Sequence, residues 1–303
     1  MIFLFTLKQK KMKSFVKESM MLLAGILILA TACNQVSNSD LAAGGKAGKG
    51  TVVVKLTDAP FPVSMVDKAM VTIDKIEIRA TDTVITTAGD TINAGQFLTL
   101  STDTQEFNLL DLRNGITADL VKIEIPAGSY DLIRMHVTES SVILTDGTQF
   151  DMKIPSGMQS GLKIKLDPEL VVENGVVNEV LVDFDVSKSF TVMGNARSRM
   201  GIKGFMFKPV LRAMCESHSG SIWGQVSGSD TIALPDANVQ ILRADTVFSS
   251  ALTNEDGKYA LIGIPAGSYQ MVCAKDGYAS DTVDAVVVSP GVKTMQDFKL
   301  TKN

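Results

Sequence analysis

The sequence MVTIDKIEIR, residues 70–79, decides the fold class of this chain. Its apolar side chains alternate with polar ones, which is the period of a β-strand with one buried face. The alternation changes phase after Ile73. A β-bulge at Asp74 and Lys75 would return the apolar side chains on both sides of it to one face. We therefore expect a bulged strand here.

Runs of the same kind lie on both sides of this stretch. Aromatic residues make up 6% and charged residues 20% of the chain, and Val, Ile, Thr, Gly and Asp recur in short alternating runs, which is typical of sheets with tight turns. A helical turn is expected at 117–121, and Asp146 and Gly147 are typical of a type I′ hairpin. The spacing predicts a sandwich or barrel, and we expect a sandwich over residues 50–213. The further expected strands are 51–57, 96–100, 106–112, 130–138, 142–144, 161–166, 178–186 and 205–211.

Length and charge narrow the class of protein. A chain of 303 residues is too long for one ordinary domain and fits two. Its formal charge is -4, and residues 1–32 contain five lysines and one glutamate, so the remainder carries a formal charge of about -8. No basic stretch with interleaved aromatic residues follows residue 33. This pattern excludes nucleic acid as a partner, because phosphate binding requires clustered Lys and Arg.

The first 33 residues have the pattern of an export signal. A basic segment at 12–17 precedes an uncharged apolar run at 20–30. The following residues, LATAC at 29–33, resemble a bacterial lipobox, although its usual leucine stands one place further from the cysteine. The resemblance implies a lipoprotein signal peptide at 1–32 and a lipid on Cys33. The alternative is an ordinary secretory signal with a free thiol, and both Met1 and Met12 are possible starts.

Residues 33–49 are small and polar and include several glycines. This composition does not bury enough apolar surface to fold, so we expect a flexible tether with a reach on the order of 20 Å. The expected location is the cell envelope, anchored by lipid in the outer membrane. The sequence leaves open whether the protein faces the periplasm or the cell surface.

Five motifs in the first expected sandwich resemble a known family. They are LTDAP at 56–60, PAGSY at 126–130, SGLKIK at 160–165, DFDVSKS at 183–189 and FKPVLR at 207–212. Their order is similar to domain of unknown function 4382, which is common in bacterial lipoproteins. The resemblance implies a β fold and an envelope location, and it implies no activity.

The C-terminal part, residues 220–303, resembles a second family. Its motifs are SIWGQV at 221–226, LPDANVQI at 234–241, TNEDGKY at 253–259, IPAGSY at 264–269 and KDGY at 275–278. They closely resemble the carboxypeptidase regulatory-like domain. This resemblance implies a transthyretin-like sandwich of seven strands with a carbohydrate-binding-like fold. In metallocarboxypeptidases this unit is the accessory domain, so no catalysis is implied.

Local patterns agree with that fold. Asp256 and Gly257 are expected to form a hairpin turn, and Tyr269, Met271 and Cys273 alternate toward the core. The hexapeptide IPAGSY occurs at 125–130 and again at 264–269. We interpret it as one turn used twice, with proline fixing φ, glycine adopting a positive φ and tyrosine burying its ring. Common ancestry and convergence are both open.

One charge pattern offers a candidate site. Lys163 and Lys165 share a strand face, and so do Asp183 and Asp185. If these strands pair, the four residues form cross-strand ion pairs. The alternative is a divalent-cation site on the two aspartates. We favour the ion pairs, because calcium requires six to eight oxygen ligands.

The sequence offers no catalytic motif, and we expect no enzyme and no cofactor. His136 and His218 are the only histidines, so a histidine-rich zinc site cannot form, and neither a phosphate-binding glycine loop nor a Gly-x-Ser-x-Gly motif is present. Cys215 and Cys273 could form a disulfide in an exported protein, but the inward phase of Cys273 favours a free, buried thiol.

The expected function is that of a non-enzymatic, lipid-anchored envelope protein with a structural or adhesive role. The partners would be the membrane, through the lipid, and another envelope protein. The alternative is a glycan-binding accessory lipoprotein of polysaccharide uptake. Few aromatic residues are available for a sugar platform, and Trp223, beside Ile222, is expected in the core.

Overall fold

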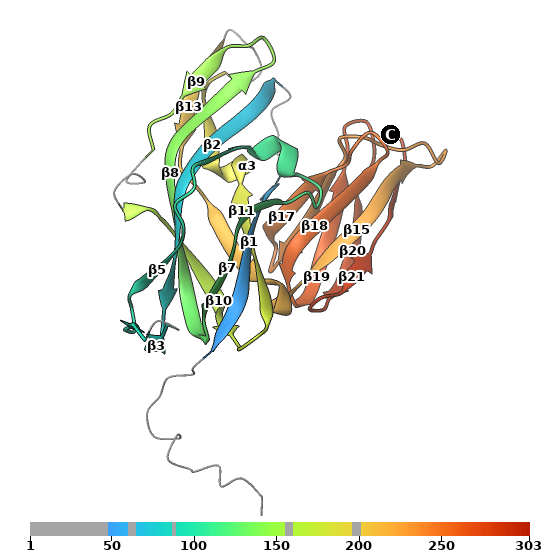
Figure 1. Cartoon of the computed structure of the whole chain (residues 1–303). Helices are drawn as coiled ribbons and strands as arrows, with labels where there is room; N and C mark the ends of the chain where they lie inside the picture. The colour runs from blue at the N-terminus through green and yellow to red at the C-terminus, as the bar shows by residue number, and fades with distance from the viewer. Residues whose placement is uncertain (1–47, 60–64, 87–88, 155–159, 196–200) are drawn as a thin grey trace, which may run out of the picture. The chain divides into compact units, whose positions relative to one another are not determined.

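The computed structural model describes residues 48–303, except 60–64, 87–88, 155–159 and 196–200. The expected signal peptide, Cys33 and nearly all of the tether lie outside the described residues. The described residues belong to one compact unit, which contains two β-sandwiches in tandem (Figure 1). The predicted all-β fold class is confirmed. In the described part of the chain, no helix is long and apolar enough to cross a membrane.

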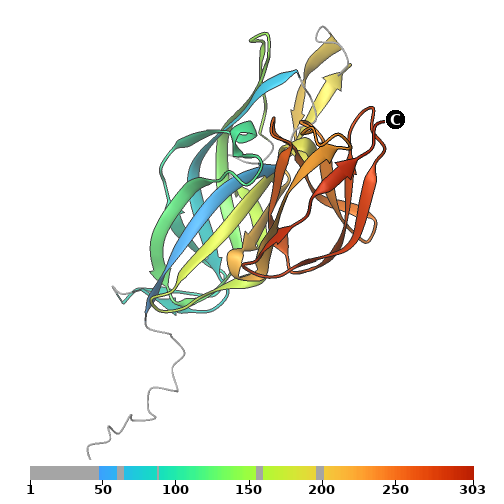
Figure 2. The same ribbon diagram turned by 90° about the vertical axis from the view of Figure 1, so that its right-hand side faces the viewer.

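The first sandwich consists of two four-stranded layers. One layer has the order β5-β2-β8-β10 and the other β14-β11-β1-β7, and they join where Leu166 of β10 pairs with Ala213 of β14. Figure 2 shows β1, in blue, beside β11, in yellow, its parallel neighbour. The strands of the layers are β1 (Lys49–Ala59), β2 (Val66–Ala80), β5 (Phe97–Ser101), β7 (Ala118–Pro126), β8 (Gly128–Leu144), β10 (Leu162–Val172), β11 (Val177–Asp185) and β14 (Leu211–Cys215).

Shorter elements complete the first sandwich. One two-stranded ribbon is formed by β12 and β13, and another by β3 and β4, while β6 pairs with β2 and β9 with β8. The short elements are β3 (Val84–Ile85), β4 (Thr91–Ile92), β6 (Gln105–Asn108), the 3-10 helix η2 (Leu109–Leu112), β9 (Gln149–Asp151), the one-turn helix α3 (Val186–Ser189), β12 (Phe190–Gly194) and β13 (Ile202–Phe207).

The expected bulge in 70–79 is confirmed. The register of β2 against β8 shifts between Ile73 and Lys75. As a result, the apolar side chains on both sides of the bulge face the core, with exposed fractions of 0 to 2% for Val71, Ile73, Ile76 and Ile78. The bulge therefore lets one strand of 15 residues contribute to the core along its length.

Three local expectations for the first sandwich are wrong. Residues 117–121 form no helical turn, because from residue 118 the chain pairs with β1 as strand β7. Residues 109–112 form the 3-10 helix η2 rather than the end of a strand. The expected strand 205–211 is divided into β13 and β14 around Pro209, which has no N–H to donate to a neighbouring strand.

The Asp146-Gly147 hairpin is confirmed, but its turn type differs from the expected one. Leu144 N donates to Thr148 O at 2.9 Å, and Gly147 N donates to Leu144 O at 2.9 Å. Gly147 has a φ of 85°, whereas Asp146 lacks the positive φ that a type I′ turn requires there. The loop is therefore a three-residue connection closed by a left-handed glycine.

The second sandwich has two layers of four strands. Strand β15 lies between β18 and β21 and also pairs with β22, while the other layer has the order β17-β16-β19-β20. The 3-10 helix η4 (Glu216–His218) connects β14 to this sandwich. The strands are β15 (Ser219–Gly228), β16 (Asn238–Arg243), β17 (Thr246–Leu252), β18 (Lys258–Pro265), β19 (Gly267–Ala274), β20 (Asp281–Val288), β21 (Lys293–Met295) and β22 (Phe298–Leu300).

Eight strand segments replace the seven expected. Two of them, β21 and β22, follow one another along β15 and are separated at Gln296 and Asp297. The turn at Asp256 and Gly257 is present, with a φ of 72° at Gly257. However, it joins β17 to β18, which lie in different layers, so it is no hairpin. The inward phase of β19 is confirmed, because alternate side chains from Tyr269 onward are buried.

The repeated hexapeptide forms the same corner in both sandwiches. It connects β7 to β8 and β18 to β19, and each time the chain passes from one layer to the other. The Tyr130 hydroxyl donates to Pro126 O, and the Tyr269 hydroxyl donates to Pro265 O, both at 2.8 Å. The expectation of one turn used twice is confirmed. The expected positive φ of the glycine is wrong in both copies.

The correspondence extends beyond the hexapeptide. Gly175 N donates to Lys49 O at 2.8 Å, and Gly291 N donates to Ser219 O at the same distance. In the first sandwich, β1 lies between the antiparallel strand β7, which ends in the hexapeptide, and the parallel strand β11, which follows the turn at Gly175. In the second, β15 lies in the same way between β18 and β21. The two sandwiches thus share one arrangement of strands around the corner.

Candidate functional site

Charged side chains gather on the outward face of β2, β8 and β10. In register, Glu77 pairs with Arg134, and Arg134 pairs with Lys163, so the three lie in one row across the strands. Lys75 and His136 form the neighbouring pair. The intervening residues of these strands are buried in the core, so alternation directs the charged side chains outward. We call these five residues the cation cluster.

Glu77 is the centre of the cation cluster. Its side chain is only 5% exposed and accepts from Arg134 Nε at 2.6 Å, Lys75 Nζ at 2.8 Å and His136 Nε2 at 3.1 Å. Burial alone would raise the pKa of Glu77, but the hydrogen bonds from Arg134, Lys75 and His136 outweigh it and lower this pKa to about 2. Glu77 is therefore an anion that fixes three basic side chains.

The basic side chains of the cluster are positioned by their surroundings. The Arg134 guanidinium lies 3.8 Å from the centre of the Phe97 ring, a cation–π contact. The Lys163 side chain is exposed and has no ion pair within the described residues. One carboxylate is thus surrounded by more basic groups than it can neutralise. The sequence pattern pointed to Lys163, but it gave no reason to connect it with Arg134.

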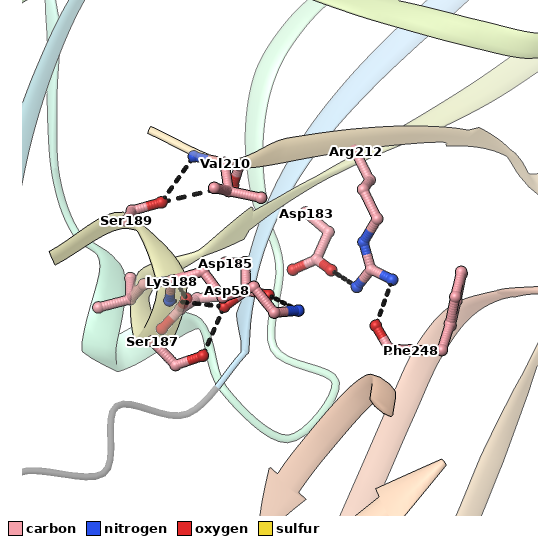
Figure 3. Close-up of polar contacts among 10 residues, drawn as sticks. Asp58, Asp183, Asp185, Ser187, Lys188, Ser189, Val210, Arg212 and Phe248 are labelled. Carbon is pink, nitrogen blue, oxygen red and sulfur yellow. Dashed lines mark hydrogen bonds and ion pairs between the residues drawn. The ribbon is translucent and has the colours of Figure 1, made fainter. Parts of the chain in front are cut away.

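The structure places the two candidate metal ligands elsewhere. Asp183 forms an ion pair with Arg212 of β14, and Asp185 Oδ2 forms one with Lys188 Nζ at 2.7 Å (Figure 3). The expected pairing of Lys163 and Lys165 with these aspartates is wrong, because β14 separates β10 from β11. Lys165 instead pairs with Asp167 at 2.9 Å.

Asp183 and Asp185 differ in their electrostatics. Burial raises the pKa of Asp183 against the opposing effect of Arg212. Burial would also raise the pKa of Asp185, but hydrogen bonds from Lys188 and Ser187 hold it below its ordinary value. Within the described ranges, no three His, Cys, Asp or Glu side chains come together in a group that could hold a metal ion. Ion pairing with basic residues is thus the arrangement that the structure shows for both aspartates.

A third aspartate, Asp58, lies beside them and was missed by the sequence reasoning. Its Oδ1 accepts from Val186 N at 3.1 Å, whereas Oδ2 is buried and has no hydrogen-bond partner among the described residues. Burial raises the pKa of Asp58 well above its ordinary value. The available signal was its phase, because Asp58 continues the inward series of Val54 and Leu56 on β1.

Trp223 is not a core residue, so that expectation is wrong. It is half-buried and points outward from β15, while its neighbour Ile222 is fully buried. Its Nε1 donates to Ser221 Oγ at 3.0 Å, and Lys293 Nζ lies 4.0 Å from the ring centre. A hollow of about 420 Å³ adjoins the ring, and its lining includes Asn114 of the first sandwich and Trp223, Gln225, Asn254, Tyr259, Lys293 and Asp297 of the second. We call this hollow the tryptophan site.

The two cysteines of the sandwiches are free and buried. Burial raises the pKa of Cys215 to about 11 and that of Cys273 to about 12. The favoured expectation of unbridged thiols agrees with the structure. Both groups are held in the neutral thiol form, which is a poor nucleophile.

The fold defines the class of the protein, which is an all-β protein with two sandwiches in tandem. Residues 49–209 match Domain of unknown function (DUF4382), and residues 221–301 match Carboxypeptidase regulatory-like domain. The first match covers a little more than half of the chain. The chain belongs to the DUF4382 family. Both family resemblances drawn from the sequence motifs are confirmed.

Similarity to solved structures is weak. The chain is 16% identical to 3-chlorocatechol 1,2-dioxygenase from Rhodococcus opacus 1CP, over 29% of this chain and 61% of that one, with a TM-score of 0.24. It is 11% identical to the major pilin subunit BcpA of Bacillus cereus, over 84% and 71%, with a TM-score of 0.24. It is 10% identical to shaft pilin SpaA of Lactobacillus rhamnosus GG, over 84% and 98%, with a TM-score of 0.25.

These TM-scores are too low to support an argument about fold or function. The chain also spans less than two thirds of the dioxygenase. No curated protein matches the sequence.

Proposed function

We propose that this chain is a non-enzymatic binding protein of the bacterial cell envelope, attached through a lipid on Cys33. The signal pattern and the lipobox-like LATAC support export and acylation. The two matched families support the non-enzymatic character, since one is of unknown function and the other is regulatory-like. In this role the sandwiches hold binding surfaces away from the membrane.

The tryptophan site is the observation that carries a binding role. Pockets for small ligands are concave, with an aromatic or apolar wall and a few polar groups that orient the ligand. The site has an indole wall at Trp223, amides at Gln225 and Asn254, and a carboxylate at Asp297. Gln225 and Asp297 are held in place by a bond from Gln225 N to Asp297 Oδ1 at 2.8 Å. The rim is therefore ordered by the strands that carry it.

The same site favours glycan as the ligand, which makes glycan uptake the second candidate function. Sugars present both hydroxyl groups and apolar ring faces, and an aromatic residue with an apolar body and polar neighbours suits both. Lys293 lies over one face of the indole, so the ligand would occupy the hollow beside the ring. A purely structural or adhesive role would not require this hollow.

A glycan array tests the choice between these functions. The probe is the exported chain with Cys33→Ser, which removes the acylation site and leaves the sandwiches unchanged. We expect neutral oligosaccharides to bind and Trp223→Ala to lose them. Val287→Ala is the matched control, because it removes an exposed apolar side chain from another strand of the same sandwich. An array without any signal would reject the glycan function and leave the adhesive one.

A further inference from the structure

Further charged side chains lie beside the cation cluster on the first sandwich, and together they form a charged array. Beside the row of Glu77, Arg134 and Lys163 runs a second row in which Arg79 pairs with Leu132 and Leu132 with Lys165. Neighbouring strands are about 4.8 Å apart, and alternate residues of one strand about 6.7 Å apart. Basic side chains thus stand at Arg134 and Lys163 in the first row and at Arg79 and Lys165 in the second, while Glu77 and Leu132 occupy the remaining positions.

This array carries surplus positive charge on an acidic chain. In the second row, Asp131 compensates Arg79 at 2.6 Å and Asp167 compensates Lys165 at 2.9 Å. In the cation cluster, Glu77 alone faces Lys75 and Arg134, and Lys163 adds another positive charge beside Arg134. The array thus bears about two more positive than negative charges, before any contribution from His136. A local field of opposite sign to the whole protein attracts anionic ligands to this face.

Arg134 is already oriented for a carboxylate ligand. Its Nε is used by Glu77, and its guanidinium rests on the Phe97 ring. The two terminal nitrogens have no hydrogen bond to any described residue. A guanidinium fixed in this way keeps a two-nitrogen fork for a planar carboxylate and loses little side-chain entropy when it binds one.

The exposed fractions of the basic side chains favour a polymer chain over a bilayer as the ligand. The side chains of Arg134 and Lys75 are only 25% and 37% exposed, whereas that of Lys165 is 72% exposed. A flat bilayer would meet the protruding Lys165 first and would not reach Arg134. A narrow polymer chain lying on the sheet can contact both.

We propose that the cation cluster binds a linear polysaccharide bearing carboxylate groups, with Arg134 and Lys163 contacting its carboxylates. This site is separate from the tryptophan site, which lies on β15 of the other sandwich. A uronate polymer presents a series of carboxylates along its length, so it can contact Arg134 and Lys163, which are neighbours across β8 and β10.

Titration with polygalacturonate at low ionic strength tests the proposal, using the exported Cys33→Ser chain. We expect saturable binding, no binding of neutral dextran, and loss of affinity as salt is added, because exposed charge pairs are screened. Lys163→Gln should weaken binding about tenfold, which corresponds to about 1.4 kcal/mol. This variant loses no ion pair among the described residues, so its melting temperature should stay unchanged.

Lys122→Gln is the matched control, because Lys122 is an exposed lysine on β7 in the opposite layer. It changes the net charge equally and should leave the affinity unchanged. Equal weakening by both variants would overturn the proposal in favour of a diffuse charge effect. Binding to vesicles rich in phosphatidylglycerol but not to polygalacturonate would also overturn it. Trp223→Ala should leave polygalacturonate binding intact. A failure of the proposal for the cation cluster can therefore be distinguished from a failure of the proposal for the tryptophan site.

Discussion

Glu77 shows how one buried carboxylate can organise a charged surface. Its pKa is lowered from 4.5 to about 2, so its ion pairs are present above pH 4.5 and are lost as the pH falls toward 2. We predict that Glu77→Gln lowers the free energy of unfolding at pH 7 by about 2 kcal/mol, because Arg134 and Lys75 lose their anion. Urea unfolding from pH 7 to pH 2 measures this, and the variant should converge with the wild type at the acidic end.

The pair of Arg79 and Asp131 provides the control on the same face. Their side chains are 36% and 27% exposed, so solvent screens their attraction. Asp131→Asn should cost less than about 1 kcal/mol at pH 7. Equal losses from Glu77→Gln and Asp131→Asn would contradict the central role of Glu77.

The pKa of Asp58 is shifted in the opposite direction to that of Glu77. Burial raises its pKa well above 3.8, so its contribution to stability is complete below pH 3.8 and is lost as the pH rises through the pKa of the folded state. Asparagine keeps the acceptor for Val186 N and carries no charge. We predict that Asp58→Asn raises the melting temperature at pH 7 by about 2–4 °C for each kcal/mol regained. Calorimetry at pH 7 and pH 3.5 measures this, and a variant that is less stable at pH 7 would contradict it.

These residues mark the limit of what sequence alone could predict for the sites. Alternation correctly put Lys163 and Asp183 on outward faces, because that property depends on the period of a strand. Their partners, Arg134 and Arg212, depend on which strands become neighbours. Asp58 was missed although its phase on β1 was visible, because a charged residue is rarely expected in a core. Trp223 was wrongly expected in the core, because the side of the strand on which an aromatic ring lies depends on the neighbouring layers.

At the scale of elements, the two IPAGSY corners make a matched experiment. Both tyrosine hydroxyls donate to the proline carbonyl four residues earlier, at 2.8 Å, and both rings are buried. We predict that Tyr130→Phe and Tyr269→Phe each cost about 1 kcal/mol, the net value of one hydrogen bond, because the ring and its packing stay. Urea unfolding of each variant and of the double variant measures this. A cost from only one of them would show that the corners are not equivalent.

The shared corner also bears on the origin of the repeat. Convergence on six residues would not by itself reproduce the bonds from Gly175 to Lys49 and from Gly291 to Ser219, which involve other segments. Gly50 and Gly220, which directly follow Lys49 and Ser219, are constrained in the same way. A Cβ on Gly50 would lie 2.5 Å from Glu173 O, and one on Gly220 would lie 2.3 Å from Ser289 O. This detailed agreement favours a common origin of the two sandwiches.

Most strands were predictable, since alternation and turn residues are local signals. The strand 70–79 with its bulge and the inward phase of β19 were correct, and the Asp146-Gly147 hairpin was correct except for its turn type. One error lies where distant pairing decides, because residues 117–121 look helical in isolation but pair with β1 as a neighbouring strand. The division of 205–211 at Pro209 has a local cause, since proline has no N–H to donate.

At the scale of the whole molecule, the sandwiches and the expected anchor have separate roles. The family motifs were enough to identify both folded parts, because each set is spread along its entire domain. The membrane attachment that we propose rests instead on one cysteine at the end of an apolar run. We predict that the wild-type chain incorporates labelled palmitate and sediments with membranes, and that Cys33→Ser does neither.

The remaining cysteines supply the controls for this last prediction. Cys215 and Cys273 are buried in the sandwiches as neutral thiols, so an acyl transferase could not reach them in the folded protein. Cys215→Ala and Cys273→Ala should therefore keep the label and the membrane fraction. One acyl chain binds membranes only marginally and reversibly, whereas two or more anchor a protein stably. A wild-type chain without label would contradict acylation of Cys33. A Cys33→Ser chain that still sediments would show that the protein reaches the membrane by another route.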